Sequence, residues 1–222
     1  GRIDTALVPV VEMCSNHGIG EYLGNPRPYG KNKNMGPSLP GGFAQDALAR
    51  GLKLGFICSS DDHTGHPGKS GPIVAVYARQ LTRKAILEAL RARRCYGTTG
   101  ARMILRLWAN GRPIGSEIEC NRPPVLRVQV YGDGPIERVE IVRNGKVCHV
   151  RRPSGEICEF EYQDERIDEE RVYYYVRVTQ RNGHIGWSSP VFVKYIGPRP
   201  QLEVEDVRII KGERLRAVSY TH

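Results

Sequence analysis

The chain has 222 residues, and its 33 Lys and Arg against 24 Asp and Glu give a net charge of +9 at pH 7. Hydrophobic residues make up 40% and charged residues 26%, near the globular average, so the composition excludes a chain that is disordered throughout. No apolar run approaches the roughly 20 residues that a membrane-spanning helix needs. The excess of cations favours anionic partners such as phosphorylated compounds or sulfated sugars, and it gives weak support for nucleic acid. A solvated basic surface explains the same charge.

Three strands and two helices are predicted in the first hundred residues. Residues 6–13, 52–58 and 71–78 are apolar without alternation, which is typical of strands that are buried on both faces of a parallel sheet. Residues 43–50 are predicted to form a short helix that a glycine ends, and residues 83–94 carry apolar side chains at helical spacing. This alternation of strands and helices predicts an α/β domain.

The pattern changes near residue 100 to strands that follow one another. Residues 125–131 alternate between apolar and polar side chains, as a strand with one face in the core does. Asn-Gly pairs at residues 110–111, 144–145 and 182–183 are signals of hairpin turns. Several short strands joined by such turns predict an immunoglobulin-like β-sandwich. The predicted division of the chain is an α/β domain, a sandwich and a C-terminal extension, over residues 1–101, 102–196 and 197–222.

Carboxylates and imidazoles follow two of the predicted buried strands. Glu12 and His17 come at the end of the first strand, and Asp61 and His63 come after the second. In α/β barrels and open α/β sheets, this edge is where active sites are built. Carboxylate and imidazole ligands suit zinc, manganese or iron, and the Asp-x-His spacing sends both side chains off a strand end in one direction. Glu12 also interrupts an apolar run, and a buried carboxylate needs a partner or a metal.

Simpler roles stay open for the same residues. Asp61 and His63 lie in the segment Ser-Ser-Asp-Asp-His-Thr-Gly, where such side chains can cap turns. The sequence also lacks a nucleophile elbow, a P-loop and a dinucleotide-binding Gly-x-Gly-x-x-Gly motif. The residues by themselves therefore leave open both a metal site and an ordinary turn.

Several segments around these residues form a specific combination. They are residues 11–18 (Val-Glu-Met-Cys-Ser-Asn-His-Gly), 45–51, 60–68 (Ser-Asp-Asp-His and onward), 93–100 (Arg-Arg-Cys-Tyr-Gly-Thr-Thr-Gly), 173–178 and 186–190. Together they resemble the C-terminal half of a domain of the PHP (polymerase and histidinol phosphatase) superfamily. The similarity is greatest to a large uncharacterised branch whose chains close with a β-sandwich.

The resemblance implies a particular fold, and it also implies that the chain is part of a longer protein. Residues 1–101 would be the C-terminal portion of a PHP-type βα barrel, followed by the immunoglobulin-like β-sandwich. Members of the superfamily open with a His-x-His motif, which does not occur in this sequence. The resemblance therefore implies that the chain is a C-terminal fragment, with the missing N-terminal part of the same protein as its partner.

The resemblance also implies a metal site. Asp61 and His63 match the last metal motif of the superfamily, His17 matches an earlier His or Cys ligand, and Glu12 is a further candidate ligand. Up to three divalent metals would activate a water molecule that attacks a phosphoester in the intact protein. The resulting expectation is a metal-dependent phosphoesterase whose present fragment is inactive. The alternative is a non-catalytic β-sandwich binding module for an anionic ligand or a protein partner.

The six cysteines are predicted to be free thiols. They are scattered and form no Cys-x-x-Cys pair, which favours a reducing compartment such as the cytoplasm. One pair is an exception. If residues 146–150 and 156–160 form a hairpin in which Val150 faces Glu156, then Cys148 lies opposite Cys158, close enough for a disulfide after a small adjustment.

Overall fold

The structure is a computed structural model that describes residues 4–27, 39–61, 63, 65–66, 71–199, 209–210 and 213–214. Its described helices are α1 (Ala44–Ala49) and α2 (Arg83–Arg91). The strands of the first half are β1 (Val10–Ser15), β2 (Gly18–Ile19), β3 (Gly55–Cys58), β4 (Ile73–Val76) and β5 (Cys95–Thr98). The strands that follow are β6 (Ile104–Ala109), β7 (Arg112–Pro113), β8 (Glu117–Cys120), β9 (Val125–Tyr131), β10 (Ile136–Arg143), β11 (Lys146–Arg151), β12 (Ile157–Gln163), β13 (Arg171–Gln180), β14 (Ile185–Ser188), β15 (Val191–Tyr195), β16 (Ile209–Ile210) and β17 (Glu213–Arg214).

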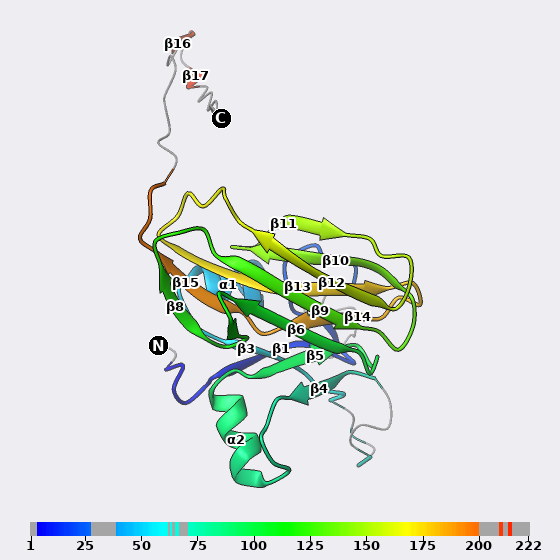
Figure 1. The fold of residues 1–222 in the computed structure, drawn as a ribbon. Coiled ribbons are helices and arrows are strands. Elements are labelled where there is room, and N and C mark those ends of the chain that lie inside the picture. Colours follow the sequence, from blue (N-terminus) through cyan, green and yellow to red (C-terminus); the bar gives the residue numbers. More distant parts are fainter. Residues whose placement is uncertain are drawn as a thin grey trace.

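Two sheets face one another in the second half of the chain (Figure 1). The larger sheet has the strand order β11-β10-β13-β14-β5-β4, and in it β15 also pairs with β13 and with β8. The smaller sheet has the order β12-β9-β6-β7. Alternating apolar side chains of both sheets form one core, in which Leu105, Val128 and Val176 are fully buried. The prediction of an all-β second half is confirmed.

Asn-Gly turns set two of the hairpins. Asn110 and Gly111 have φ angles of 47° and 75° between β6 and β7, and Asn144 and Gly145 have φ angles of 45° and 79° between β10 and β11. Two successive positive φ angles are the geometry of the type I′ turn, which Asn and Gly tolerate and which matches the twist of the strands. These two predicted hairpins are confirmed.

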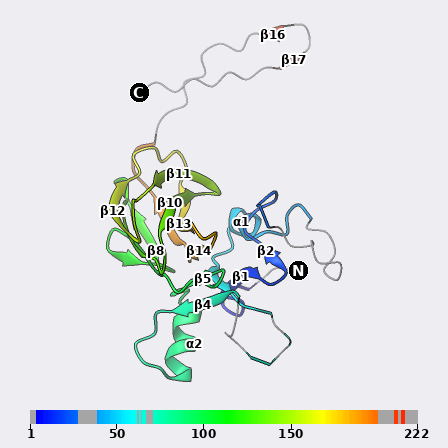
Figure 2. The ribbon, with the colours of Figure 1, turned by 90° about the vertical axis from the view of Figure 1, so that its right-hand side faces the viewer.

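A second apolar core lies between the larger sheet and the first half of the chain (Figure 2). Side chains of β13 alternate between the two cores, because Tyr174 and Val176 face the inside of the sandwich whereas Tyr173 and Tyr175 face the second core. The ring of Tyr175 meets that of Phe56 on β3 edge to face, at 5.2 Å between centroids. The larger sheet is therefore covered on both faces around β13.

The predicted C-terminal portion of a PHP-type βα barrel is wrong. β1 and β3 pair in parallel, as predicted, but β4 and β5 pair antiparallel and β5 joins the sandwich sheet through β14. The described residues contain no βα barrel. The error has a physical cause. The third predicted strand, over residues 71–78, contains β4, whose described partner is β5, and β5 has the sequence Cys-Tyr-Gly-Thr, which is not an apolar run. β5 lies between two cores, because Gly97 packs on Cys58 of β3 and Tyr96 faces the sandwich core.

The larger sheet continues across the predicted boundary between residues 101 and 102. β5 precedes this position in the chain and β14 follows it, yet the two strands are hydrogen-bonded neighbours. The division at residue 101 therefore runs between two strands of one sheet. Of the predicted extension, residues 197–199 belong to the described residues, together with β16 and β17, and the others lie outside them.

The predicted hairpin with Cys148 opposite Cys158 is also wrong. Cys148 lies on β11, which pairs with β10 in the larger sheet, whereas Cys158 lies on β12 and faces Val130 of β9 in the smaller sheet. The intervening residues cross from one sheet to the other, because β11 pairs with β10 and β12 pairs with β9. All six cysteines are free thiols.

The α2 helix projects from the rest of the molecule (Figures 1 and 2). Thr82 caps its first turn, since its hydroxyl oxygen accepts a hydrogen bond of 3.2 Å from the amide of Ala85. Ala89 is the one buried residue of this helix. Neither of the two described helices has the length and apolar character needed to cross a membrane.

Candidate functional site

The parallel pairing of β1 and β3 brings two polar loops to one edge of the molecule. The amide of Asn16, just after β1, donates to the carbonyl of Ser60 at 3.2 Å, and the amide of Ser59 donates to the carbonyl of Cys14 at 3.1 Å. These backbone hydrogen bonds hold the loop of His17 against the loop that follows β3. The predicted site residues are therefore positioned by the ends of two neighbouring strands.

Three of the four predicted site residues meet at this edge. Nε2 of His17 lies 2.8 Å from Oδ2 of Asp61, and Nε2 of His63 lies 3.7 Å from Oδ1 of the same carboxylate. Exposure rises across the cluster, from 18% for the side chain of His17 to 43% for Asp61 and 89% for His63. Asp61 also has a φ angle of 48°, a left-handed conformation that Asp tolerates better than most residues. The sequence thus predicted the convergence of these residues.

Glu12 lies one step further back, on β1 itself. It is half-buried, and its Oε2 accepts a hydrogen bond from the hydroxyl of Ser59. A partner of this kind satisfies the carboxylate that interrupts the apolar run.

A metal centre at this edge is not supported. Within the part of the chain that the structure describes, no group of three or more His, Cys, Asp or Glu side chains is arranged to hold a metal ion. Both oxygens of Asp61 lie next to imidazoles, and Nδ1 of His17 is buried and has no hydrogen-bond partner among the described residues. The metal-binding and hydrolase assignments that the resemblance implied for Glu12, His17, Asp61 and His63 are therefore not supported by the described residues. A site for zinc, manganese or iron in a longer protein stays a prediction.

Sequence analysis missed a buried carboxylate in the first half of the chain. Glu21 is only 2% exposed, and its Oε1 accepts hydrogen bonds from Tyr175 at 2.6 Å and from Arg177 at 2.9 Å. Its Oε2 accepts a hydrogen bond from Nε1 of Trp187 at 2.8 Å. All three donors belong to β13 and β14, so this network joins the first half to the sandwich. No sequence pattern around Glu21 could have identified these partners, because they lie more than 150 positions further along the chain.

A second candidate site lies at the edge of the sandwich where β11 leads into β12. A surface hollow of about 320 Å³ is lined there by Arg151, Arg152, Pro153, Ile157, Cys158, Glu159 and Phe160. The guanidinium carbon of Arg151 lies 5.6 Å from the centroid of the Phe160 ring, a cation–π contact. Next to it, the ring of His149 stacks on that of Tyr162 at 4.4 Å between centroids.

The two arginines of this hollow differ from the more buried arginines of the sandwich. Arg177 pairs with Glu140 and Glu21, and Arg143 pairs with Asp164. In contrast, Arg151 and Arg152 form no ion pair with any described residue. The one carboxylate that lines the hollow, Glu159, accepts a hydrogen bond from Tyr131. The hollow therefore offers two guanidinium groups whose charge is not balanced by a carboxylate in an ion pair.

This chain is similar to known proteins whose function is unknown. Residues 66–123 match the model of a family described as protein of unknown function (DUF3604). Curated proteins named uncharacterized protein are 32% identical in Chlamydia muridarum and 31% identical in Chlamydia trachomatis, each over an alignment of 217 positions that covers 83% of this chain. The match covers 34% of each of these proteins, so the chain spans about a third of their length.

The predicted PHP resemblance is wrong on these comparisons, because the family model that matches is that of DUF3604 and the described fold contains no βα barrel. Among solved structures, the fibronectin(III)-like modules of Clostridium thermocellum CbhA are 21% identical to this chain. They cover 43% of it and 100% of their own length, with a TM-score of 0.29.

Proposed function

We propose that the protein is a non-catalytic β-sandwich binding module for an anionic ligand, which it binds in the hollow formed by Arg151 and Arg152. The observation that carries the proposal is that two guanidinium groups line one hollow and form no ion pair with the described residues. A guanidinium donates parallel hydrogen bonds to phosphate, sulfate or carboxylate oxygens, which makes arginine the preferred residue for such groups.

The lining of the hollow indicates what else the ligand carries. Phe160, Ile157 and Pro153 provide an apolar wall next to the two cations. A volume of about 320 Å³ lies at the lower end of the range for small-molecule sites. A small anion with a ring or another apolar group would contact both parts of the site.

The net charge of the chain also favours an anionic ligand. At +9, the chain attracts anions over distances of several ångströms beyond contact. Because added salt screens exposed charges over roughly 8–10 Å, the affinity should decrease as ionic strength rises.

The test is a calorimetric titration of the protein with phenyl phosphate, at low and at physiological salt. We expect binding that Arg151→Gln and Arg152→Gln each weaken by about tenfold or more, which corresponds to the 1.4 kcal/mol of one charged contact. Arg127→Gln is the matched control, since Arg127 lies on β9 over the ring of Trp108, away from the lining of the hollow. Absence of binding by the wild-type protein, or equal weakening by the control, would refute the proposal.

The phosphate of such a ligand can belong to a small molecule or to a nucleic acid. A parallel titration with a single-stranded oligonucleotide separates these sources. Tighter binding of the oligonucleotide that depends on Arg151 and Arg152 assigns the hollow to nucleic acid, whereas weaker binding assigns it to small anions.

A further inference from the structure

A different surface, formed by β4 and α2, is left open at the opposite end of the larger sheet. β4 is the last strand of that sheet and pairs only with β5 among the described strands. Its sequence is Ile-Val-Ala-Val, and Val74 is 42% exposed. Native edge strands are commonly protected by short length, lysine, proline, a bulge or a covering element. β4 is short, with four residues after Pro72, but its own side chains include no lysine or proline. This edge therefore has the properties of a strand that accepts another strand.

The register between β4 and β5 shows which backbone groups of β4 are free to pair with another strand. Ala75 faces Tyr96 across the ladder, and the amide of Tyr77 donates to the carbonyl of Arg94 at 2.9 Å. In an antiparallel pair, the hydrogen-bonding groups of successive residues point to alternate sides. The amide and carbonyl of Val74 consequently point away from β5, toward the open edge.

Apolar side chains of the segment that follows β4 are exposed as well. Leu81 is 95% exposed and Leu87 is 45% exposed, and α2 buries only Ala89. An amphipathic helix owes most of its stability to the packing of its apolar side, which this helix does not complete against the described chain. The surface is thus incompletely covered over both the strand and the helix.

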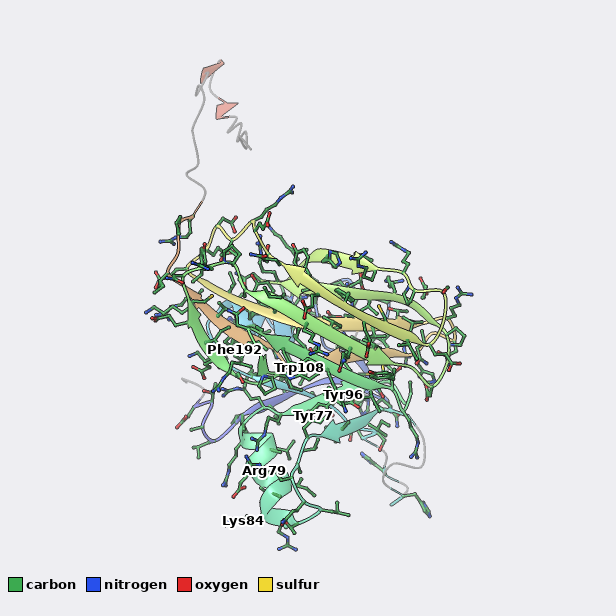
Figure 3. The ribbon with its side chains drawn as sticks, viewed as in Figure 1. Tyr77, Arg79, Lys84, Tyr96, Trp108 and Phe192 are labelled. Atoms are coloured by element: carbon green, nitrogen blue, oxygen red, sulfur yellow. The ribbon has the colours of Figure 1, made fainter. Side chains whose placement is uncertain are left out.

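The charge of the surface limits what can cover it. Arg79, Arg83, Lys84 and Arg91 are exposed and form no ion pair within the described part of the chain, while Glu88 is the one acidic residue of α2. Figure 3 shows the side chains of Arg79 and Lys84 on the projecting part of the molecule, beyond Tyr77 and Tyr96. A second copy would present the same excess of cations, so charge complementarity does not favour self-association. An acidic partner is favoured instead.

We infer that the β4–α2 surface is an interface for a further polypeptide segment, which adds an extended strand to the edge at Val74 and places carboxylates against the cations of α2. The length of the curated relatives indicates the source of this segment. Because the matched region is only 34% of the Chlamydia muridarum protein, most of that protein lies outside it and is available to cover this surface. Strand addition of this kind uses main-chain hydrogen bonds for affinity and alternate side chains for specificity.

The experiment compares proline substitutions in this chain and at the aligned positions of the full-length Chlamydia muridarum protein. Val74→Pro removes an amide that points away from β5, so it should lower the Tm of this chain by less than about 2 °C. In the longer protein it should remove a hydrogen bond to the added strand and lower the Tm by more than about 5 °C. Ala75→Pro is the matched control. It removes an amide that faces β5 and should destabilise both proteins alike.

Hydrogen exchange of the same amides gives a second readout that needs no substitution. We expect the amide of Val74 to exchange rapidly in this chain and its counterpart to be protected in the longer protein. Rapid exchange in both proteins, or equal tolerance of Val74→Pro in both, would overturn the inference.

Two further measurements on this chain distinguish the other possible occupants of the β4–α2 surface. Light scattering gives the mass of the protein in solution, and co-sedimentation with phosphatidylserine–phosphatidylcholine vesicles detects membrane binding. A monomer that does not sediment with the vesicles supports a polypeptide occupant. A dimer that Val74→Pro abolishes would overturn the inference in favour of a second copy. Sedimentation with the vesicles that Leu81→Asp abolishes would overturn it in favour of a membrane surface.

Discussion

Nε1 of Trp187 donates a hydrogen bond of 2.8 Å to the carboxylate of Glu21, which is 2% exposed. The two residues lie 166 positions apart, in the sandwich and in the first half of the chain. Burial by itself would lower the pKa of Arg177, but its hydrogen bond with Glu140 and the charges of Glu21 and Glu140 raise it. The network therefore holds a charged pair in the interface between two cores, and the two halves of the chain should unfold together.

The first prediction is that Glu21→Leu lowers the free energy of unfolding by about 3–5 kcal/mol. The substitution leaves the hydroxyl of Tyr175 and the indole N–H of Trp187 without their acceptor, and it removes one of the two carboxylates that pair with Arg177. This is costlier than the loss of an exposed pair. Urea unfolding, monitored by circular dichroism, measures this change in the free energy of unfolding. Glu119→Leu is the control, because Glu119 pairs with Lys194 on the surface with its side chain 54% exposed. Equal effects of both substitutions would contradict the role of the buried network.

The second prediction concerns the contact between β5 and β3. A Cβ atom on Gly97 would lie 2.7 Å from the amide nitrogen of Cys58, a backbone atom that cannot move without moving the strand. We expect Gly97→Ala to destabilise the protein by about 1–3 kcal/mol, as overpacking of a core does. The matched control is Gly155→Ala, since a Cβ atom on Gly155 would meet nothing within 4 Å. Differential scanning calorimetry of both variants should show a lower Tm for Gly97→Ala alone.

The third prediction is a pH dependence that originates at His149. Burial, and secondarily the charge of Arg151, lower the pKa of this imidazole. The folded state then binds fewer protons than the unfolded state, so the contribution of His149 to stability is complete above its unfolded pKa of about 6.5 and decreases as the pH falls below it. Between about pH 7.5 and pH 5.5, the Tm should decrease more in the wild type than in His149→Phe. His66→Gln, at an exposed position, is the control and should retain the wild-type slope.

The fourth prediction concerns thiol reactivity. Burial raises the pKa of Cys95 to about 11 and that of Cys148 to about 12, so little thiolate is present at neutral pH. Cys120 is half-exposed and should react first with an alkylating reagent in the folded protein. Denaturation without reductant should then make all six thiols accessible to the reagent. Mass spectrometry that finds fewer than six alkylated cysteines would contradict this prediction and indicate a disulfide.

Local chemistry made some elements of this fold predictable. The Asn-Gly pairs at residues 110–111 and 144–145 required positive φ angles that few other residues adopt, so the turns followed from the residues alone. The helix that the spacing of apolar side chains predicted over residues 83–94 is found over Arg83–Arg91, where Thr82 caps it. The meeting of His17 with Asp61 followed from the parallel pairing of two strands, because such strands end at the same edge of a sheet.

The sequence could not identify which residues far apart in the chain contact one another. The arginines of the hollow at Arg151 and Arg152 became a candidate site only when their lack of ion-pair partners was visible. The same holds for Cys148 and Cys158, whose spacing suggested a hairpin although their strands pair with two different strands, β10 and β9.

The sequence by itself determined where the chain turns and which segments are apolar enough to be strands, because turn geometry and burial are properties of residues and their neighbours. Only the tertiary structure decided that the apolar segment with β4 pairs antiparallel with β5 at the end of a sandwich sheet, since an apolar run does not show the direction of the strand that it pairs with. It also decided that Glu21 is buried, because the three donors that offset its desolvation come from strands more than 150 residues away.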